Sequence, residues 1–388
     1  MNSSPPLVSR IQTFPLEFVL TDGGHGASKS RPSARSATLV KLTASDGTVG
    51  WGESFGPPRL IAEFIREAAG WVIGRPVDER AGVWLDRLNR QYHLTAAGPQ
   101  VLAFSGIDLA MWDAQARALG VPLSSLLGGR VRSSVGAYAS TGYYHEAGDA
   151  GPLRSYLEQA VAEGFTAAKI KIGSGAAGDV ERVSIARELL GADGTLMVDY
   201  NTNATLDTAL VSMRAIAPFG IHWAEEPLLP GDSGWSRLRD AGIPLAAGEA
   251  LYTRYGFRDP IAHRQLDIAQ PNLSVCGGFT EANAIVAIAS AFSVRVAPHV
   301  WGTGVLLAAT LQLLAVLPDA PFGERTPYPP LLEFDRGENP LREGVLMRPI
   351  TAAAGVVEVP DGPGLGIDVD EHALAQWLVA SHALDITT

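Results

Sequence analysis

The chain has 388 residues, of which 46% are hydrophobic and 18% are charged, and its formal net charge is −11 at pH 7. This composition predicts a globular protein with a sizeable core, most naturally divided into two domains. The acidic balance argues against nucleic acid or an anionic membrane surface as the main partner, so we expect neither.

Three further features bear on the compartment. The first ten residues, MNSSPPLVSR, lack a basic stretch followed by an apolar one, so no secretory signal is expected. The longest apolar stretches, such as 304–317, are too short to span a bilayer. The single cysteine, Cys276, excludes an internal disulfide and fits a reducing compartment. We therefore expect a cytoplasmic protein.

The first third of the chain alternates like β-strands and then becomes helical. Residues 8–20 and 37–54 carry the strand pattern, and an Asp-Gly pair within the second range predicts a hairpin turn. Helical periodicity follows from about 59 to 119. Strands followed by helices predict a separate α+β domain, which we place at residues 1–131.

From residue 132 to 350, short β-rich runs alternate with amphipathic helical stretches. Successive runs are 22 to 32 residues apart, the size of one βα unit, and they end near residues 140, 172, 201, 227, 250, 272 and 299. With an eighth run expected within 321–333, this spacing predicts an α/β fold with a modified TIM barrel, (β/α)7β. A doubly wound open sheet is the alternative, but no Gly-rich dinucleotide turn follows any of these runs. The tail, 351–388, is expected to leave the barrel and pack on the first domain.

Polar residues stand at the ends of these runs, where a barrel places its catalytic groups. Lys169 and Lys171 are two positions apart on one strand and so point to the same face. Asp199, Glu225 and Glu249 take the same place in three successive units. Each carboxylate alone could simply cap a helix, but three together would repel unless a cation lay among them. Hard oxygen ligands favour Mg²⁺ over zinc.

A magnesium site beside two lysines suits removal of the proton next to a substrate carboxylate. The product of that step is an enediolate, whose charge the metal and Lys169 can stabilise. A lysine base must be deprotonated near neutral pH, and we expect Lys169 to lower the pKa of Lys171. Two lysines and a metal would also attract an anionic substrate to an acidic protein.

Several segments resemble the mandelate racemase/muconate lactonizing enzyme family of the enolase superfamily. They are KIKIG, VDYN, WAEEP, GEA, SGIDLAMWDAQARALGVPLSSLLGG and DGPGLGIDVD. The resemblance covers nearly the whole chain. It implies one Mg²⁺ per subunit held by Asp199, Glu225 and Glu249. It also implies that the domain at 1–131 caps the barrel and is completed by the tail.

The resemblance also implies roles around the α-carbon of the substrate. Lys171 corresponds to the base on one face, with Lys169 assisting at the substrate carboxylate. His299 corresponds to the acid/base on the opposite face, which marks the mandelate racemase subgroup. Glu333 resembles a glutamate that the family carries near the C-terminal end of its barrel and that contacts the substrate carboxylate.

One position departs from the family pattern. Asn272, in QPNLSVCGG, stands where the family has an aspartate paired with the strand-seven histidine. A neutral amide cannot stabilise an imidazolium, so we expect His299 to be a weaker base than its aspartate-backed counterparts. An amide can also present its NH₂ and select the other tautomer, and the analogous change in serine proteases lowers turnover by about 10⁴. Because racemisation needs two matched bases, Asn272 favours one-base chemistry.

Further segments narrow the expected reaction. GWGESFGPPR, HVWGTGV and LLEFDRGENPLR are similar to those of galactarolactone cycloisomerases, which open a sugar-acid lactone by β-elimination. We therefore expect an isomerase or lyase in which Lys171 removes the α-proton and His299 acts as the acid. The alternatives are an acid-sugar dehydratase, a racemase or epimerase of a 2-hydroxy acid and, from another class, a non-catalytic carboxylate-binding barrel. The expected partner is a small acid sugar or its lactone, and we expect a homo-oligomer, from dimer to octamer.

Five further residues are expected to contact the substrate. Asn201 follows a strand end, and Asn272 faces the strand-seven histidine. Trp301 is placed to line the pocket, and Tyr143 follows the first barrel strand, where it could bind hydroxyls. His25 lies in TDGGHGAS, a loop that the family uses to cap the barrel. Loop histidines are often only solvated and loop aromatics often only pack, so these assignments compete with simple structural ones.

Overall fold

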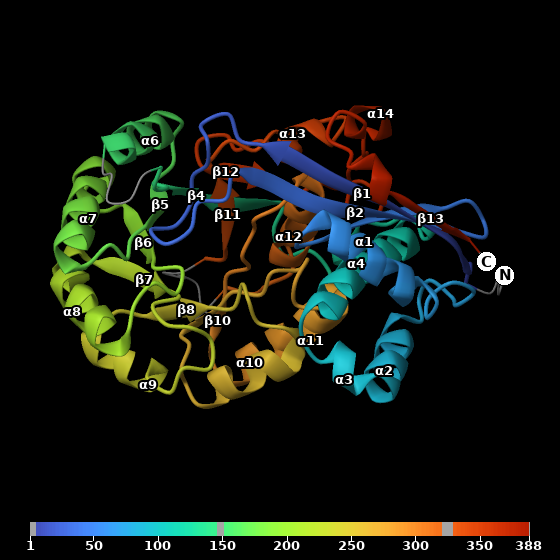
Figure 1. Cartoon of the computed structure of the whole chain (residues 1–388), viewed down its shortest axis with the longest axis horizontal. Coiled ribbons are helices and arrows are strands. Elements are labelled where there is room, and N and C mark those ends of the chain that lie inside the picture. The colour runs from blue at the N-terminus through green and yellow to red at the C-terminus, as the bar shows by residue number, and fades with distance from the viewer. Residues whose placement is uncertain (1–4, 146–150, 320–328, 388) are drawn as a thin grey trace.

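A computed structural model of the chain describes residues 5–145, 151–319 and 329–387. Figure 1 shows two bodies, a curled parallel sheet with helices around its outside and a smaller body of antiparallel strands and helices. The first part of the eighth run expected at 321–333 lies outside the described residues.

The smaller body contains a four-stranded antiparallel sheet. Its first three strands, β1 (Val8–Val19), β2 (Ala34–Ala44) and β3 (Val49–Ser54), pair in chain order. The turn between β2 and β3 is the predicted hairpin, with Gly47 at φ 87°, a conformation that favours glycine. The helices of this body are α1 (Pro58–Ala69), α2 (Arg80–Arg90), α3 (Tyr92–Thr95) and α4 (Pro99–Ala118).

The fourth strand of this sheet comes from the other end of the chain. β13 (Leu384–Thr387) pairs antiparallel with β1, with Thr387 opposite Arg10. In Figure 1 the red C-terminal strand accordingly lies beside the blue N-terminal strands. The tail does not leave the barrel at once, because β12 (Val356–Glu358) pairs antiparallel with a barrel strand, β4. The tail also includes α14 (Glu371–Leu374).

The larger body is a parallel sheet of eight strands, joined in the order β10-β9-β8-β7-β6-β5-β4-β11. The strands are β4 (Ser134–Thr141), β5 (Ala167–Lys171), β6 (Thr195–Asp199), β7 (Ile221–Glu225), β8 (Leu245–Ala247), β9 (Ile268–Ala269), β10 (Arg295–Val296) and β11 (Leu331–Asp335). The helices of this part of the chain are α5 (Leu123–Leu126), α6 (Gly151–Ala162), α7 (Ala176–Leu190), α8 (Leu206–Ile216), α9 (Trp235–Leu238), α10 (Thr253–Ala262), α11 (Gly278–Ala291), α12 (Gly304–Leu314) and α13 (Pro340–Gly344). A helix follows each of the first seven strands, which confirms the predicted (β/α)7β order. In the described ranges, no helix combines the length and the apolarity needed to cross a membrane.

The interior of the barrel is filled by one side chain from each strand or from the residue just after it. These are Tyr138, Ala167, Met197, Trp223, Ala246, Ile268, Ala297 and Leu331. Side chains alternate between the two faces of a strand, so the residue two positions later also points inward, one layer nearer the carboxyl ends. This apolar layer therefore forms the floor beneath the next layer, in which most of the residues are polar.

Candidate active site

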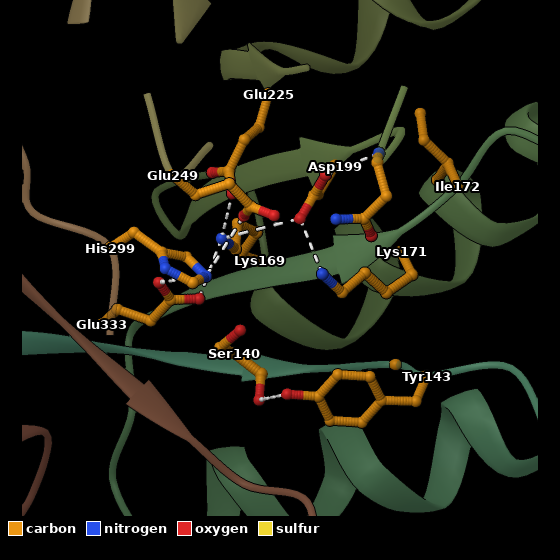
Figure 2. Close-up of polar contacts among 12 residues, drawn as sticks. Ser140, Tyr143, Lys169, Lys171, Ile172, Asp199, Glu225, Glu249, His299 and Glu333 are labelled. Atoms are coloured by element: carbon orange, nitrogen blue, oxygen red, sulfur yellow. Dashed lines mark hydrogen bonds and ion pairs between the residues drawn. The ribbon is translucent and has the colours of Figure 1, made fainter. Parts of the chain in front are cut away.

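The layer above the apolar floor holds one of the two lysines, the histidine and three of the carboxylates that the sequence singled out. Two positions after the floor residues come Ser140, Lys169, Asp199, Glu225, Gly248, Gln270, His299 and Glu333. Figure 2 shows members and neighbours of this layer converging from several strands, among them both lysines, His299 and Glu333. The barrel thus brings together residues that are up to 193 positions apart in the sequence.

Three carboxylates form the candidate metal centre. Asp199 ends β6, Glu225 ends β7 and Glu249 follows β8, and one ligand atom from each lies within 4.8 Å of the others. Asp199 and Glu225 are buried, whereas the side chain of Glu249 is partly exposed. Within the part of the chain that the structure describes, this is the one group of at least three acidic, His or Cys side chains close enough to hold an ion.

The charges around these carboxylates fit a cation site. Burial raises the pKa of Glu225 to about 8, and repulsion from Asp199 and Glu333 adds to this against the attraction of Lys169. Asp199 is also buried, but Lys171 and Lys169 outweigh burial and hold its pKa at about 2. The protein thus crowds more acidic groups here than its own lysines can keep ionised at neutral pH. All three donors are hard oxygens, the ligand type that Mg²⁺ prefers.

Lys169 lies at the centre of the acidic groups. Its Nζ contacts Glu225 Oε1, lies 2.8 Å from Glu333 Oε1 and is 3.7 Å from Asp199 Oδ2. Burial alone would lower the pKa of Lys169, but Glu225, Glu333 and its other neighbours together raise it well above the usual value. Lys169 is therefore a permanent cation, suited to binding an anion rather than to removing a proton.

Lys171 departs from one sequence-based expectation. Its Nζ donates a hydrogen bond to Asp199 Oδ2 at 2.7 Å, on the side of the cluster away from His299 (Figure 2). Burial and Lys169 do lower the pKa of Lys171, as expected, but Asp199, with Glu249 and Glu225, outweighs them and raises it. Lys169 thus acts in the expected direction, but the net pKa of Lys171 is raised because Asp199 approaches from the next strand.

His299 lies on the opposite side of the carboxylates, between two acidic side chains. Its Nε2 is 3.1 Å from Glu249 Oε2 and 4.0 Å from Glu333 Oε2. Its Nδ1 is 2.9 Å from Nδ2 of Asn272. Glu333 itself is fixed by the backbone N–H of Val300, which donates to its Oε2 at 3.0 Å. A substrate lying against the carboxylates would therefore have Lys171 on one side and His299 on the other.

Two members of this layer were missed by sequence reasoning. Ser140 is buried at the end of β4, and among the described residues its Oγ has no hydrogen-bond partner. Figure 2 shows Ser140 beside the cluster of Lys169, Lys171 and Glu333. Gln270 donates from Nε2 to Glu225 Oε2 at 2.6 Å and so orients a candidate metal ligand. The sequence could have indicated them by position, since each stands two residues after an inward-facing residue of the apolar floor.

Two of the residues expected to bind substrate border the cluster. Asn201 adopts φ 43° and donates its backbone N–H to Asp199 Oδ1 at 2.8 Å, while its own Oδ1 has no partner in the described ranges. Tyr143 is buried, donates its hydroxyl to Asp335 Oδ1 at 2.6 Å and places its ring 5.9 Å from Lys171 Nζ.

His25 and Trp301 meet at a residue that the sequence did not suggest, Arg35 on β2. The guanidinium of Arg35 lies 3.6 Å from the ring centroid of Trp301, and its Nη2 is 3.2 Å from His25 Nε2. The other ring nitrogen of His25, Nδ1, is 2.7 Å from Asp22 Oδ2. Both nitrogens of His25 are thus engaged within the protein, and the expected substrate contacts of His25 and Trp301 stay predictions.

A buried glutamate joins the smaller body to the segment that carries His299. Glu53 on β3 accepts hydrogen bonds from Thr303 Oγ1 at 2.6 Å, from Thr303 N at 3.0 Å and from Leu306 N at 3.0 Å. These donors lie at the N-terminus of α12, four to seven residues after His299. Burial raises the pKa of Glu53 to about 7 against the effect of these donors.

Family models match most of the chain. Residues 25–128 match the family described as mandelate racemase/muconate lactonizing enzyme, N-terminal domain, and residues 153–373 match the one described as enolase C-terminal domain-like.

The names of known proteins similar to this chain indicate that those proteins act on acid sugars. A D-galactarolactone cycloisomerase of Agrobacterium fabrum is 40% identical over 95% of this chain and 98% of its own length. A D-galactonate dehydratase of Variovorax paradoxus is 30% identical over 87% of this chain and 89% of its own length.

Solved structures agree with these relatives over nearly the whole chain. The 3,6-anhydro-D-galactonate cycloisomerase from Zobellia galactanivorans has a TM-score of 0.86 and 32% identity, covering 96% of this chain and 99% of that one. A racemase from Streptomyces coelicolor A3(2) with bound magnesium has a TM-score of 0.84 and 27% identity, covering 96% and 100%.

Proposed function

This chain belongs to the mandelate racemase/muconate lactonizing enzyme family of the enolase superfamily, and on that premise we propose that it opens the lactone ring of an acid sugar by β-elimination. Its relatives are enzymes named as cycloisomerases and acid-sugar dehydratases, so the non-catalytic barrel is set aside. The observation that carries the proposal is the placement of Lys171 and His299 on opposite sides of the carboxylates, with the amide of Asn272 next to Nδ1 of His299.

Asp199, Glu225 and Glu249 would hold Mg²⁺, since their oxygens converge and their charges are incompletely balanced by the protein. When bound, Mg²⁺ would supply positive charge that stabilises an enediolate and that offsets the carboxylate charge keeping Lys171 protonated. Gln270 and the backbone N–H of Asn201 hold two of these carboxylates in place.

Lys169 and Ser140 are the groups that bind the substrate carboxylate. Lys169 is buried and charged, and the hydroxyl of Ser140 is buried beside it with no partner among the described residues. A substrate carboxylate would satisfy the Ser140 hydroxyl and add one further anionic partner to those that Lys169 already has. Binding there sets the α-carbon between Lys171 and His299.

The reaction then proceeds by proton removal and ring opening. Lys171 Nζ takes the α-proton, and the C–H electron pair moves into the carboxylate. The pair returns to form a double bond between the α- and β-carbons as the β-carbon–oxygen bond of the ring breaks, and the ring oxygen keeps that bond's electrons. The resulting enol becomes a ketone when its hydroxyl loses a proton to water and the β-carbon gains one. Lys171 then releases the α-proton to water; written as free acids, the substrate and the product have the same composition, so the reaction is an isomerisation.

A panel of acid-sugar lactones, followed by NMR in D₂O with Mg²⁺ present, tests the proposal. A substrate deuterated at the α-carbon should lose its label, and the keto-acid product should carry solvent deuterium at the former β-carbon. Lys171→Ala should slow this reaction by about 10³-fold or more. Lys41→Ala, a lysine on β2 that pairs with Glu371, is the matched control and should keep the wild-type rate. A Lys171→Ala variant with the wild-type rate, or plain hydrolysis of the lactone to the hydroxy acid, would contradict the proposal.

A second candidate is dehydration of an open-chain acid sugar, favoured by the name of the Variovorax paradoxus relative. The same residues would remove the α-proton, but hydroxide would leave from the β-carbon. Open-chain acids belong in the same panel, because their keto-acid products identify this reaction. Racemisation is disfavoured by Asn272, which supplies no negative charge to His299.

A further inference from the structure

The orientation of the Asn272 amide is fixed by its neighbours. Asn272 is buried, and its Oδ1 accepts the backbone N–H of Ser274 at 2.9 Å and the Ser274 hydroxyl at 2.7 Å. A backbone N–H can only donate, so the atom facing it must be the amide oxygen. A flipped amide would set its NH₂ against that N–H and leave a buried donor unsatisfied. The NH₂ group therefore faces His299.

The loop that carries this amide is itself anchored. Val275 N and Cys276 N donate to the carbonyl of Asn272 at 2.9 and 2.8 Å. From the smaller body, the N–H of Phe55 donates to the carbonyl of Ser274 at 3.2 Å. Rotation of the Asn272 side-chain amide would break its two hydrogen bonds from Ser274, and the anchored loop does not replace them. The orientation of the amide is therefore a property of the fold.

An amide NH₂ that faces His299 determines where the imidazole carries its proton. Nδ1 of His299 lies 2.9 Å from Asn272 Nδ2 and must present its lone pair, because two donors cannot form a hydrogen bond. The proton of the neutral ring is then on Nε2, which faces acceptors on both sides, Glu249 Oε2 at 3.1 Å and Glu333 Oε2 at 4.0 Å. The tautomer therefore follows from the fixed orientation of the Asn272 amide.

A neutral imidazole that carries its only proton on Nε2 has limited chemistry. It has no lone pair at Nε2 with which to remove a substrate proton. It can donate a hydrogen bond to a departing oxygen, but full transfer of the proton would leave an imidazolate. A neutral histidine that acts as a hydrogen-bond donor in this way is a known catalytic device.

The leaving group decides whether such a donor is sufficient. Carboxylic acids have pKa values of about 4 and water about 16, so hydroxide is a far poorer leaving group by roughly 12 units. The ring oxygen of a lactone departs as a carboxylate and needs no proton. Hydroxide, or the alkoxide of a cyclic ether, needs a proton from a general acid as the bond breaks.

We propose that Asn272 is a positioning residue that holds the proton of His299 on Nε2, where it serves as a hydrogen-bond donor, and thereby restricts the enzyme to substrates whose β-leaving group departs as a carboxylate. The inference rests on the proposed function, and it separates ring opening of lactones from the dehydration and cyclic-ether reactions that the same lysine and carboxylates could otherwise support.

The first test observes the tautomer directly, independent of catalysis. Solid-state ¹⁵N NMR of protein labelled at histidine, with His299→Gln used to assign the signals, should show an N–H at Nε2 and a bare, hydrogen-bonded Nδ1. The result should hold with and without Mg²⁺. In Asn272→Asp the carboxylate accepts a proton from Nδ1, so an Nδ1–H signal should appear. An Nδ1–H signal in the wild-type protein would overturn the proposal.

The second test compares leaving groups across matched variants. The wild-type protein should open an acid-sugar lactone at least about 10²-fold faster than it dehydrates the corresponding open-chain acid. Asn272→Asp should raise dehydration relative to ring opening by about 10²-fold, because the ring can then carry a second proton on Nε2. Asn272→Ala removes the donor without adding charge and should not gain dehydration. An unchanged ratio in a folded Asn272→Asp protein would overturn the inference.

Failure of the proposed function would look different. A wild-type protein that converts neither lactones nor open-chain acids and exchanges no α-proton contradicts the proposed reaction, while the NMR experiment still decides the tautomer. If Asn272→Asp does not fold, the wild-type tautomer and the wild-type preference between the two substrates still decide the proposal. Wild-type protein that dehydrates the open-chain acid as fast as it opens the lactone would overturn the leaving-group argument.

Discussion

Replacement of Glu53 by glutamine should change how the stability of the protein depends on pH. Glu53 is buried between β3 and the N-terminus of α12, and its pKa is raised from 4.5 to about 7 in the folded protein. Folding therefore favours the protonated form of this side chain. The associated stability is fully present below pH 4.5 and is lost as pH rises through about 7.

The magnitude follows from the size of the shift. A difference of about 2.5 pH units corresponds to about 3 kcal/mol of unfolding free energy at 1.36 kcal/mol per unit. Glutamine resembles the protonated acid in shape and polarity but does not titrate. The stability of the wild-type protein minus that of Glu53→Gln should thus fall by about 3 kcal/mol between pH 4.5 and pH 8. Asp108, whose pKa burial also raises to about 7, is present in both proteins and cancels.

Chemical denaturation followed by tryptophan fluorescence at several pH values measures this difference. Glu181→Gln, at an exposed position on α7, is the matched control and should give a difference independent of pH. If the Glu53→Gln difference were equally flat, Glu53 would not be titrating as its burial implies. The argument that a buried carboxylate holds α12 against β3 would then fail.

Three other substitutions test separate parts of the site. Gln270→Ala removes the hydrogen bond to Glu225 Oε2 and should weaken Mg²⁺ binding by about 10- to 100-fold in calorimetric titration. Ser140→Ala should leave the unfolding midpoint and the Mg²⁺ affinity unchanged, because the Ser140 hydroxyl has no partner among the described residues. The same variant should raise KM about tenfold, because the hydroxyl no longer binds the substrate carboxylate. An unchanged KM would show that Ser140 is not part of the carboxylate site. Gly302→Ala would set a Cβ 2.1 Å from Glu53 Oε1, so we expect about 1–3 kcal/mol of destabilisation and a lower kcat. A variant as stable as the wild-type protein would contradict this close approach.

The order of strands and helices was predictable from the sequence because its signals are local. Short apolar runs at βα spacing define the barrel, and charged residues at their ends stand out against the apolar background. Asp199, Glu225 and Glu249 were recognisable in this way, and their side chains do meet in the folded chain.

What the sequence did not reveal depends on contacts between distant segments. Ser140 and Gln270 are uncharged and carry no signal until the strands are aligned into layers. The raised pKa of Lys171 comes from Asp199 on the adjacent strand, which no spacing argument weighs. The sequence left both orientations of the Asn272 amide open, and it is Ser274 that decides between them.

The pairing of β13 with β1 bears on how the protein folds during synthesis. Residues 384–387 are the last described residues to leave the ribosome, yet they complete the sheet that begins at Val8. The edge of β1 that β13 covers stays open while the barrel is being made, and an unpaired strand edge invites aggregation. We expect the barrel to assemble first and the smaller body to close last. Truncation before residue 384 should therefore yield a protein that forms its catalytic barrel but self-associates along β1.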